Sequence, residues 1–210
     1  FLALLEKQNI SWNKDYPEFD SVELGSLSQP VASIEGFSSG LFLVQDFASQ
    51  IIPGLLEIQP HHRVLDSCAA PGNKSFHIAS RLNATGELVA CDVNPHRLAE
   101  TRENLRRLGI EKACIVAGDC SQESFIKILG EFDRILVDAP CSSLGVLRHN
   151  PEVKYSLSED NLESHSDNQS RILQNVSKIL RPGGLLVYSV CSISREETLD
   201  VAHSFLSNND

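Results

Sequence analysis

From residue 63 onward, short apolar runs alternate with stretches of helical spacing, and no other feature of the sequence constrains the fold as strongly. Each apolar run has four to six residues, which suits a strand better than a helix. Strands covered on both faces are continuous apolar runs of this kind. The pattern predicts a doubly wound α/β domain, with a mostly parallel sheet and helices on both faces. We expect strands at 63–66, 87–92, 114–118, 134–138 and 185–190, and helices at 74–82, 95–108, 122–129, 158–180 and 196–206.

The first 60 residues lack this alternation. Residues 1–9 have helical spacing, and the stretch 12–40 is broken repeatedly by Pro, Ser and Gly. We expect a short strand at 40–45 and then a helix at 46–57 that Pro53 bends. The chain is therefore divided into a partial lead-in subdomain, residues 1–60, and an α/β domain, residues 61–210.

Composition limits what such a domain can do. The chain has 18 Lys and Arg against 28 Asp and Glu, a net charge of −10, which disfavours indiscriminate nucleic-acid binding. No apolar run approaches the roughly 20 residues of a membrane span. The six cysteines form no Cys-x-x-Cys pair, and neighbouring histidines lack ligand spacing, so we expect no metal site. With no signal peptide pattern, we expect reduced thiols and a cytoplasmic location.

Polar residues stand where the expected strands end. Asp66, Asp92 and Asp138 end three strands, Asp119 lies just past a fourth, and Cys191 follows the last. Ligands of open α/β sheets bind at the carboxyl ends of the strands. A single aspartate there is more often a helix cap or turn former, but four aspartates and a cysteine in register favour one shared crevice.

The loop after the first strand argues against two common ligands. It has neither the GxGxxG pattern of dinucleotide sites nor a Walker A sequence. Its small residues Ala69, Ala70 and Gly72 allow a ligand to approach the backbone closely. Asp92 is placed to bond ribose hydroxyls, and Asp119 to bond an adenine amino group. A ribose and adenine site without a phosphate cradle suggests S-adenosylmethionine.

Two cysteines and an aspartate indicate the chemistry. Asp138 and Cys141 lie in the sequence Asp-Ala-Pro-Cys-Ser, and Cys191 lies at the end of the next expected strand. A thiolate that adds to C6 of cytosine makes C5 nucleophilic enough to take a methyl group. A carboxyl group bonded to N3 stabilises the charge that develops there, and a second thiol serves release. The sequence thus supplies the three groups that this reaction requires: one cysteine that attacks C6, one cysteine that assists release, and one aspartate that bonds N3.

The remaining cysteines have a simpler interpretation. A lone cysteine near a strand end is more often a small buried hydrophobic residue than a nucleophile. We assign that role to Cys91 and Cys114, and expect Cys120 to be structural as well.

Several motifs in one order make the sequence similar to a known family. They are Gln45-Asp46 with Ala48-Ser49-Gln50, the loop Cys68–Lys74, the Asp138–Ser142 motif followed by Gly145, Val146 and Arg148, and Val190-Cys191-Ser192. From about Ser33 to Phe205 the chain resembles the RsmB/Sun (NSUN-type) RNA cytosine-C5 methyltransferases, above all their bacterial ribosomal-RNA members. The resemblance implies a Rossmann-like S-adenosylmethionine-dependent methyltransferase domain over residues 61–210.

The resemblance also implies roles for residues. Cys191 would be the nucleophile that attacks C6, and Cys141 would assist product release. Asp138 would contact the cofactor region and N3, and Lys74 would lie near the target base, although a lysine at a helix start is often simply solvated. In a DNA-type mechanism Cys141 would be the nucleophile instead. The implied cofactor-binding residues are Cys68, Ala69, Ala70, Pro71, Gly72, Asn73, Lys74, Asp92, Asp119 and Asp138.

Three residues depart from the family pattern. Asn73 replaces a glycine, so we expect a positive φ there; Asn tolerates this better than most residues. Val190 stands in place of threonine and Thr198 in place of asparagine. None of the three removes a catalytic group. The sequence stops before the last strands of the family fold and lacks its helical RNA-binding domain, so we expect a fragment.

We therefore expect an RNA cytosine-C5 methyltransferase that forms 5-methylcytosine, with 16S ribosomal RNA the favoured substrate, transfer RNA the alternative, and no DNA or membrane partner. Arg148, His149 and Lys154 are candidates for RNA contacts. The arginines of the helix at 95–108 are expected on a solvated face. A catalytically inactive RNA-binding homologue is a second hypothesis. A small-molecule methyltransferase is a third, and it leaves the paired cysteines unexplained.

Overall fold

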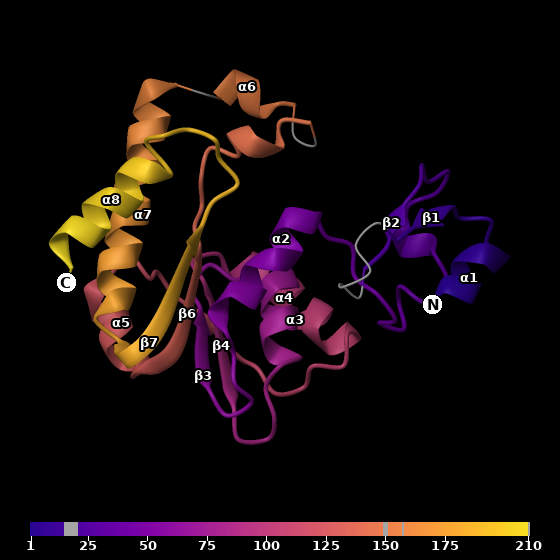
Figure 1. The fold of residues 1–210 in the computed structure, drawn as a ribbon, viewed down its shortest axis with the longest axis horizontal. Coiled ribbons are helices and arrows are strands. Elements are labelled where there is room, and N and C mark those ends of the chain that lie inside the picture. The colour runs from indigo at the N-terminus through magenta and orange to yellow at the C-terminus, as the bar shows by residue number, and fades with distance from the viewer. Residues whose placement is uncertain (15–20, 149–150, 157, 210) are drawn as a thin grey trace.

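The computed structural model describes residues 1–14, 21–148, 151–156 and 158–209. Five parallel strands form one sheet in the order β5-β4-β3-β6-β7 (Figure 1). They are β3 (Arg63–Asp66), β4 (Glu87–Asp92), β5 (Cys114–Ala117), β6 (Phe132–Asp138) and β7 (Leu180–Ser189). The strand order reverses between β3 and β6, which places a crevice at their carboxyl ends. The predicted doubly wound parallel sheet is confirmed.

Helices cover both faces of this sheet (Figure 1). Side chains alternate between the faces, so Leu65 and Val137 pack on one side while Val64 and Leu136 pack on the other. The first face is covered by α5 (Glu123–Leu129), α7 (Glu159–Ser177) and α8 (Leu199–Asn208), the second by η2 (Ile52–Leu56), α3 (Asn73–Ala79) and α4 (Pro95–Arg107). None of the described helices is long and apolar enough to cross a membrane.

Local chemistry sets where two of these helices begin. The Asn94 side chain accepts hydrogen bonds from the backbone of His96 and Arg97, and Pro95 occupies the first turn of α4. Ser158 caps α7 in the same way, as the sequence predicts. β7 starts earlier than expected, because Leu180 pairs with Phe132 across an irregularity in the ladder.

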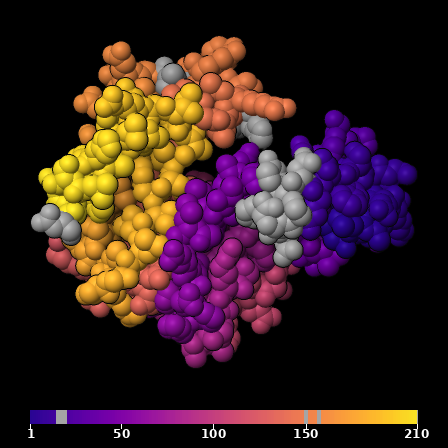
Figure 2. Space-filling model, viewed as in Figure 1, coloured from indigo at the N-terminus to yellow at the C-terminus, as the bar shows by residue number. Residues whose placement is uncertain are grey.

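The N-terminal segment projects from the body as a separate lobe (Figures 1 and 2). It contains α1 (Leu2–Lys7), the short antiparallel pair β1 (Trp12–Asn13) and β2 (Glu23–Leu24), and η1 (Val31–Ser33). The next helix, α2 (Phe47–Ile51), lies on the body beside η2 and α3. The strand expected at 40–45 is wrong, because those residues pair with no neighbouring strand in the described part of the chain. Gly40 instead lies against α4, where an added Cβ would fall 1.8 Å from the carbonyl oxygen of Arg107.

Arg107 fastens this segment to the sheet domain. Its guanidinium donates to the carbonyl oxygens of Phe37 at 2.6 Å and Phe42 at 3.0 Å, and it stacks over the Phe37 ring at 4.0 Å. A second arginine of α4, Arg97, donates to the carbonyl of Ala70 in the loop after β3. The expectation that the α4 arginines form a solvated face is therefore wrong for Arg107, which is half-buried, whereas Arg97, Arg102 and Arg106 are exposed.

Replacing Arg107 with alanine should loosen residues 36–43 while leaving the sheet intact. The variant loses two charge-assisted hydrogen bonds and one cation–π contact, on the order of 1–3 kcal/mol of local stability. Hydrogen exchange of the backbone amides measures this directly. Arg106→Ala is the matched control, since Arg106 is exposed. Equal exchange rates at 36–43 in both variants would contradict the role assigned to Arg107.

The shorter elements η3 (Leu144–Val146) and α6 (Val153–Ser156) lie in the long connection between β6 and α7. Figure 1 places α6 beyond the end of the sheet from which the loops after β6 and β7 emerge.

Candidate active site

The loop after β3 is held by its own backbone and by neighbouring elements. Ser67 donates from both its amide and its hydroxyl to the carbonyl of Leu136, and the Ala69 amide donates to the carbonyl of Cys91 at 2.7 Å. The Asn104 side chain of α4 donates to the carbonyl of Pro71. The loop is therefore fixed against β4, β6 and α4 before any ligand binds.

A glycine turns the loop into α3. Gly72 has φ +100°, and an added Cβ would lie 2.9 Å from the methyl carbon of Thr101. The positive φ expected at Asn73 is wrong, because Gly72 takes it and Asn73 begins the helix. The Asn73 side chain instead donates to the carbonyl of Val44 at 3.3 Å, which ties the lead-in segment to the loop.

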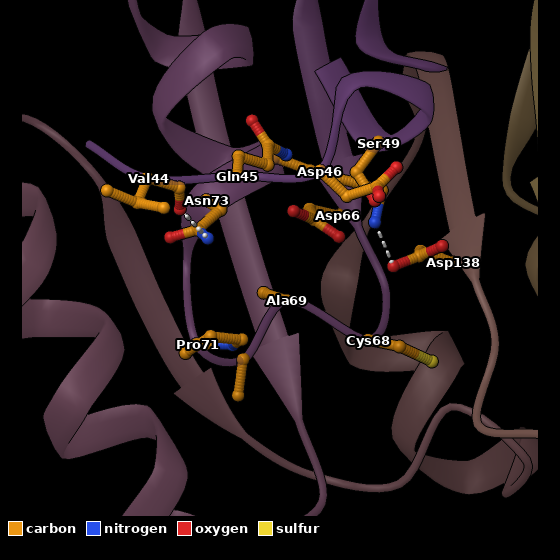
Figure 3. Close-up of a pocket in the computed structure, with 12 residues that line it drawn as sticks. Val44, Gln45, Asp46, Ser49, Asp66, Cys68, Ala69, Pro71, Asn73 and Asp138 are labelled. Carbon is orange, nitrogen blue, oxygen red and sulfur yellow. Dashed lines mark hydrogen bonds and ion pairs between the residues drawn. The ribbon is translucent and has the colours of Figure 1, made fainter. Parts of the chain in front are cut away.

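A cavity of about 490 Å³ opens between that segment and the loop. Figure 3 shows Val44, Gln45 and Asp46 along one side, Ala69 and Pro71 on the opposite side, and Asp66 between them. Its lining residues are Val44, Gln45, Asp46, Ser49, Asp66, Cys68, Ala69, Ala70, Pro71, Asn73, Lys74 and Asp138. The structure thus brings most of the predicted cofactor loop to one cavity, together with part of the lead-in segment.

Asp66 is the most deeply buried acid of this cavity. Its Oδ2 accepts a hydrogen bond from the Ser75 hydroxyl at 2.6 Å, while Oδ1 has no partner among the described residues. Burial raises the pKa of Asp66 to about 7, against the opposing effect of the Ser75 bond. The sequence placed Asp66 in the crevice but assigned it no role; its position at the end of the first sheet strand was the available signal.

Lys74 and Asp138 meet at the edge of the cavity. The Lys74 ammonium lies 2.5 Å from Asp138 Oδ2, and the Ser189 hydroxyl donates to Oδ1 at 2.7 Å (Figure 3 shows the ion pair). Lys74 comes from α3 and Asp138 from the end of β6, so the pair spans the point at which the strand order reverses. The solvated alternative for Lys74 is excluded by this contact.

Asp92 and Asp119 lie at the ends of β4 and β5, outside the cavity lining. Asp92 is buried and accepts from the amides of Ala70 and Asn94. Burial would raise the pKa of Asp119, but hydrogen bonds from Ser121 and Gln122 outweigh it and lower that pKa. Asp92 thus positions the loop, and the ribose and adenine contacts of the two residues stay predictions.

The two predicted catalytic cysteines face each other. Cys141 follows β6, Cys191 follows β7, and their sulfurs are 3.3 Å apart. The hydrogen bond from the Cys141 thiol lowers the pKa of Cys191 to about 6, and the Ser143 hydroxyl, 3.4 Å from Cys191 Sγ, acts in the same direction against burial. The same contact and burial raise the pKa of Cys141. Cys191 is therefore the thiol that ionises first.

The other cysteines do not have this environment. Burial raises the pKa of Cys68, which makes its thiol a poor nucleophile. Cys91 and Cys120 are buried, as expected, but the prediction for Cys114 is wrong: it lies exposed on the edge strand β5. Within the described ranges no three metal-ligating side chains gather.

The expected RNA contacts lie on the surface. Arg148 and Lys154 are exposed, and the Lys154 ammonium lies over the ring of the exposed Tyr155. His149 lies outside the described residues.

Solved structures share this architecture. NSun6 from Pyrococcus horikoshii, solved with SFG, is 32% identical with a TM-score of 0.78, over 89% of this chain and 46% of that one. A methyltransferase homologue from the same organism is 31% identical with a TM-score of 0.83, over 99% of this chain and 65% of that one. The fold and the cavity at its carboxyl edge define a Rossmann-like methyltransferase domain.

Sequence comparison gives the family. The family model described as 16S rRNA methyltransferase RsmB/F matches residues 53–210, and the chain belongs to that family. Ribosomal RNA small subunit methyltransferase B of Vibrio vulnificus (strain YJ016) is 36% identical over 207 residues, which are 99% of this chain and 48% of that protein. The chain thus spans about half the length of this relative.

The thiol pair predicts how Cys191 reacts. Its alkylation by iodoacetamide should reach half its maximal rate near pH 6, because the thiolate forms there. Cys141→Ala should move this midpoint upward by more than one pH unit, since the strongest bond to the thiolate is lost. Mass spectrometry of the Cys191 peptide gives the rate, with the exposed Cys114 as an internal control for the reagent. A midpoint unchanged in Cys141→Ala would contradict this assignment.

Asp66 predicts a pH effect on stability. Because its folded-state pKa lies above the ordinary value of 3.8, the stability linked to this group is greatest below pH 4 and falls as the pH rises towards 7. Asp66→Asn should remove that loss, by up to about 4 kcal/mol at pH 8, and change little at pH 4.

Urea unfolding between pH 4 and 8 measures the Asp66 effect as a difference from the unmutated chain. Ser75→Ala is the control, and it should make the loss of stability at high pH larger, because it removes the hydrogen bond that favours the charged Asp66 carboxylate. Parallel stability curves for Asp66→Asn and the unmutated chain would show that this carboxyl does not titrate as described.

Proposed function

We propose that the chain is the catalytic part of an S-adenosylmethionine-dependent methyltransferase that makes 5-methylcytosine in ribosomal RNA, 16S RNA being the favoured substrate, in the cytoplasm. One observation carries the proposal: the sulfurs of Cys141 and Cys191 lie 3.3 Å apart, Cys141 after the strand that ends in Asp138 and Cys191 after the neighbouring strand. The hydrogen bond between the two thiols lowers the pKa of Cys191 to about 6. Methyl transfer to oxygen or nitrogen needs no thiol nucleophile, whereas transfer to cytosine C5 does.

The cavity suits the cofactor. Its small loop residues leave the backbone open to close approach. Asp66 Oδ1, which has no partner in the described part of the chain, offers an acceptor to a cationic or hydroxyl group. NSun6, whose structure was solved with the S-adenosylmethionine analogue SFG, supports the same assignment. The loop Cys68–Lys74 would hold the cofactor, with Asp92 fixing that loop. When bound, the cofactor supplies the electrophilic methyl group.

The residues of this chain would prepare the cytosine. The Cys191 thiolate attacks C6, a carbon–sulfur bond forms, and electron density moves towards C5 and N3. Asp138 faces the N3 edge, and the Lys74 ammonium beside it supplies positive charge where negative charge develops. After C5 has taken the methyl group, a base removes the C5 proton and the sulfur–C6 bond breaks. Cys141 lies next to that bond and assists its breakage.

The substrate must reach this site as an unstacked base. A cytosine inside a helix would have to be flipped out to contact Cys191. Arg148 and Lys154, with the exposed Tyr155, offer positive charge and a stacking surface in the connection that follows Cys141. Within this proposal, residues 1–60 form a lead-in subdomain that supplies one wall of the cavity, and residues 61–210 form the catalytic domain.

Two cysteine variants test the chemistry. With labelled S-adenosylmethionine and small-subunit ribosomal RNA, Cys141→Ala should accumulate a covalent RNA adduct, because attack proceeds and release does not. Cys191→Ala should form neither adduct nor methylated RNA. Gel electrophoresis under denaturing conditions detects the adduct, and label in the RNA reports transfer.

The exposed cysteine provides the matched control for this experiment. Cys114→Ala should methylate as the unmutated chain does, because Cys114 lies on the edge strand β5. Methylation that persists in Cys191→Ala would show that Cys141 is the nucleophile, as in a DNA-type mechanism. Cofactor binding without methylation of any RNA by the unmutated chain would contradict the proposed activity.

A further inference from the structure

Behind the two thiols lies an acid that the proposed reaction does not use. Glu197 stands between Cys191 and α8, and its residue surface is 0% exposed. In the described part of the chain no Lys, Arg or His forms an ion pair with it. A buried carboxylate without a cation is unfavourable unless donors surround it.

Uncharged donors do surround it. Glu197 accepts from the Ser142 amide at 2.8 Å, from the Ser142 hydroxyl, and from the Gln169 side chain at 3.1 Å. Burial alone would raise the pKa of Glu197, but the bonds from Ser142, Ser192 and Gln169 outweigh it and lower that pKa. Glu197 is therefore ionised and can accept from several groups at once.

These donors belong to the two loops that carry the thiols. Ser142 directly follows Cys141, and Ser192 directly follows Cys191; their hydroxyl oxygens are 3.1 Å apart. Gln169 of α7 also donates to the carbonyl of Pro140, just before Cys141. The Glu197 carboxylate thus accepts hydrogen bonds from the serine after each thiol and from Gln169 of α7, the helix that contacts the Cys141 loop.

The sheet alone does not fix these loops. Strand pairing between β6 and β7 ends with the bond from the Ala139 amide to the carbonyl of Ser189. Past that point, Gly145 donates to the carbonyl of Cys191 at 2.9 Å. In the part of the chain that the structure describes, the remaining contacts between the loops are those of the thiols and of the Ser142, Ser192 and Glu197 cluster.

We propose that Glu197 is a positioning residue that sets the distance between the Cys141 and Cys191 thiols. Its carboxylate draws Ser142 and Ser192 together, and the sulfur atoms of the preceding residues follow. The consequence for RNA methylation rests on the proposed function, but the consequence for the thiols does not. Loss of Glu197 should affect Cys141 most, because Ser142 makes two of the bonds.

Oxidation of the thiol pair measures their separation without any substrate. Diamide takes up the two protons and two electrons that Cys141 and Cys191 lose when they form a disulfide. In the full 210-residue chain, Glu197→Ala should form this disulfide at least about ten times more slowly, a difference that corresponds to about 1.4 kcal/mol. Glu197→Gln keeps the shape but loses acceptor capacity, so its rate should lie between. Peptide mapping by mass spectrometry identifies the bridge.

The neighbouring acid provides the matched control. Glu196 is exposed and bonds to the Ser194 hydroxyl in the same segment. Glu196→Ala should keep both the disulfide rate and the pH midpoint of Cys191 alkylation. In Glu197→Ala that midpoint should rise, because the Cys141 thiol no longer reaches the thiolate. A general loosening of the segment would affect both variants alike.

The outcomes are distinct. A folded Glu197→Ala variant with an unchanged disulfide rate and an unchanged alkylation midpoint overturns the proposal. If circular dichroism shows that Glu197→Ala does not fold, Glu197→Gln and Ser142→Ala replace it, and unchanged rates in both overturn the proposal equally. Covalent RNA adduct that accumulates in Glu197→Gln, as in Cys141→Ala, supports it further. If the unmutated chain methylates no RNA, the proposed function fails while the thiol measurements still test Glu197.

Discussion

Parallel pairing of β3, β6 and β7 is the constraint on which the rest of the structure depends. Its register sets Asp66 opposite Leu136 and Asp138 opposite Ser189. Side chains from three distant parts of the sequence therefore lie at the same edge of the sheet. The apolar residues just before these ends lock the register, because a shift by one residue would turn every buried side chain to the wrong face. The packing of the core therefore sets the positions of the strand ends that carry Asp66 and Asp138, and the loops after the strands supply the other residues of the site.

The acids at this edge are stabilised in three different ways. Asp138 has a cation, Lys74, within contact distance, while the donors to Glu197 in the described ranges are all uncharged. Asp66 has a single hydroxyl donor for one oxygen and none for the other among the described residues, and burial favours its neutral form. These differences follow from which element lies opposite each strand end. They leave Asp66 as the acid best placed to gain a partner from a ligand.

The alternation of apolar runs and helical stretches along the sequence predicted the sheet. The prediction failed where an apolar run has no strand beside it to pair with. The strands at 63–66 and 87–92 were predicted because buried parallel strands are continuous apolar runs. Cys191 was predicted because its motif follows a strand, and Lys74 because it belongs to the loop motif that follows the first sheet strand. The run at 40–45 is equally apolar, but it has no neighbouring strand among the described residues and lies against Arg107 instead. The sequence alone does not single out Glu197, because its hydrogen-bond donors lie in segments 28 and 55 residues away.

Proximity of the two thiols explains why they would play different parts. At 3.3 Å, two thiolates would repel each other strongly, so only one can be ionised near neutral pH. The thiol that stays protonated donates its hydrogen bond and makes its neighbour the better nucleophile. In the proposed reaction the attacking sulfur is then bonded to carbon and uncharged, so the neighbour no longer has an anion to stabilise. It becomes free to act on the adduct, and one short contact thus supports both attack and release.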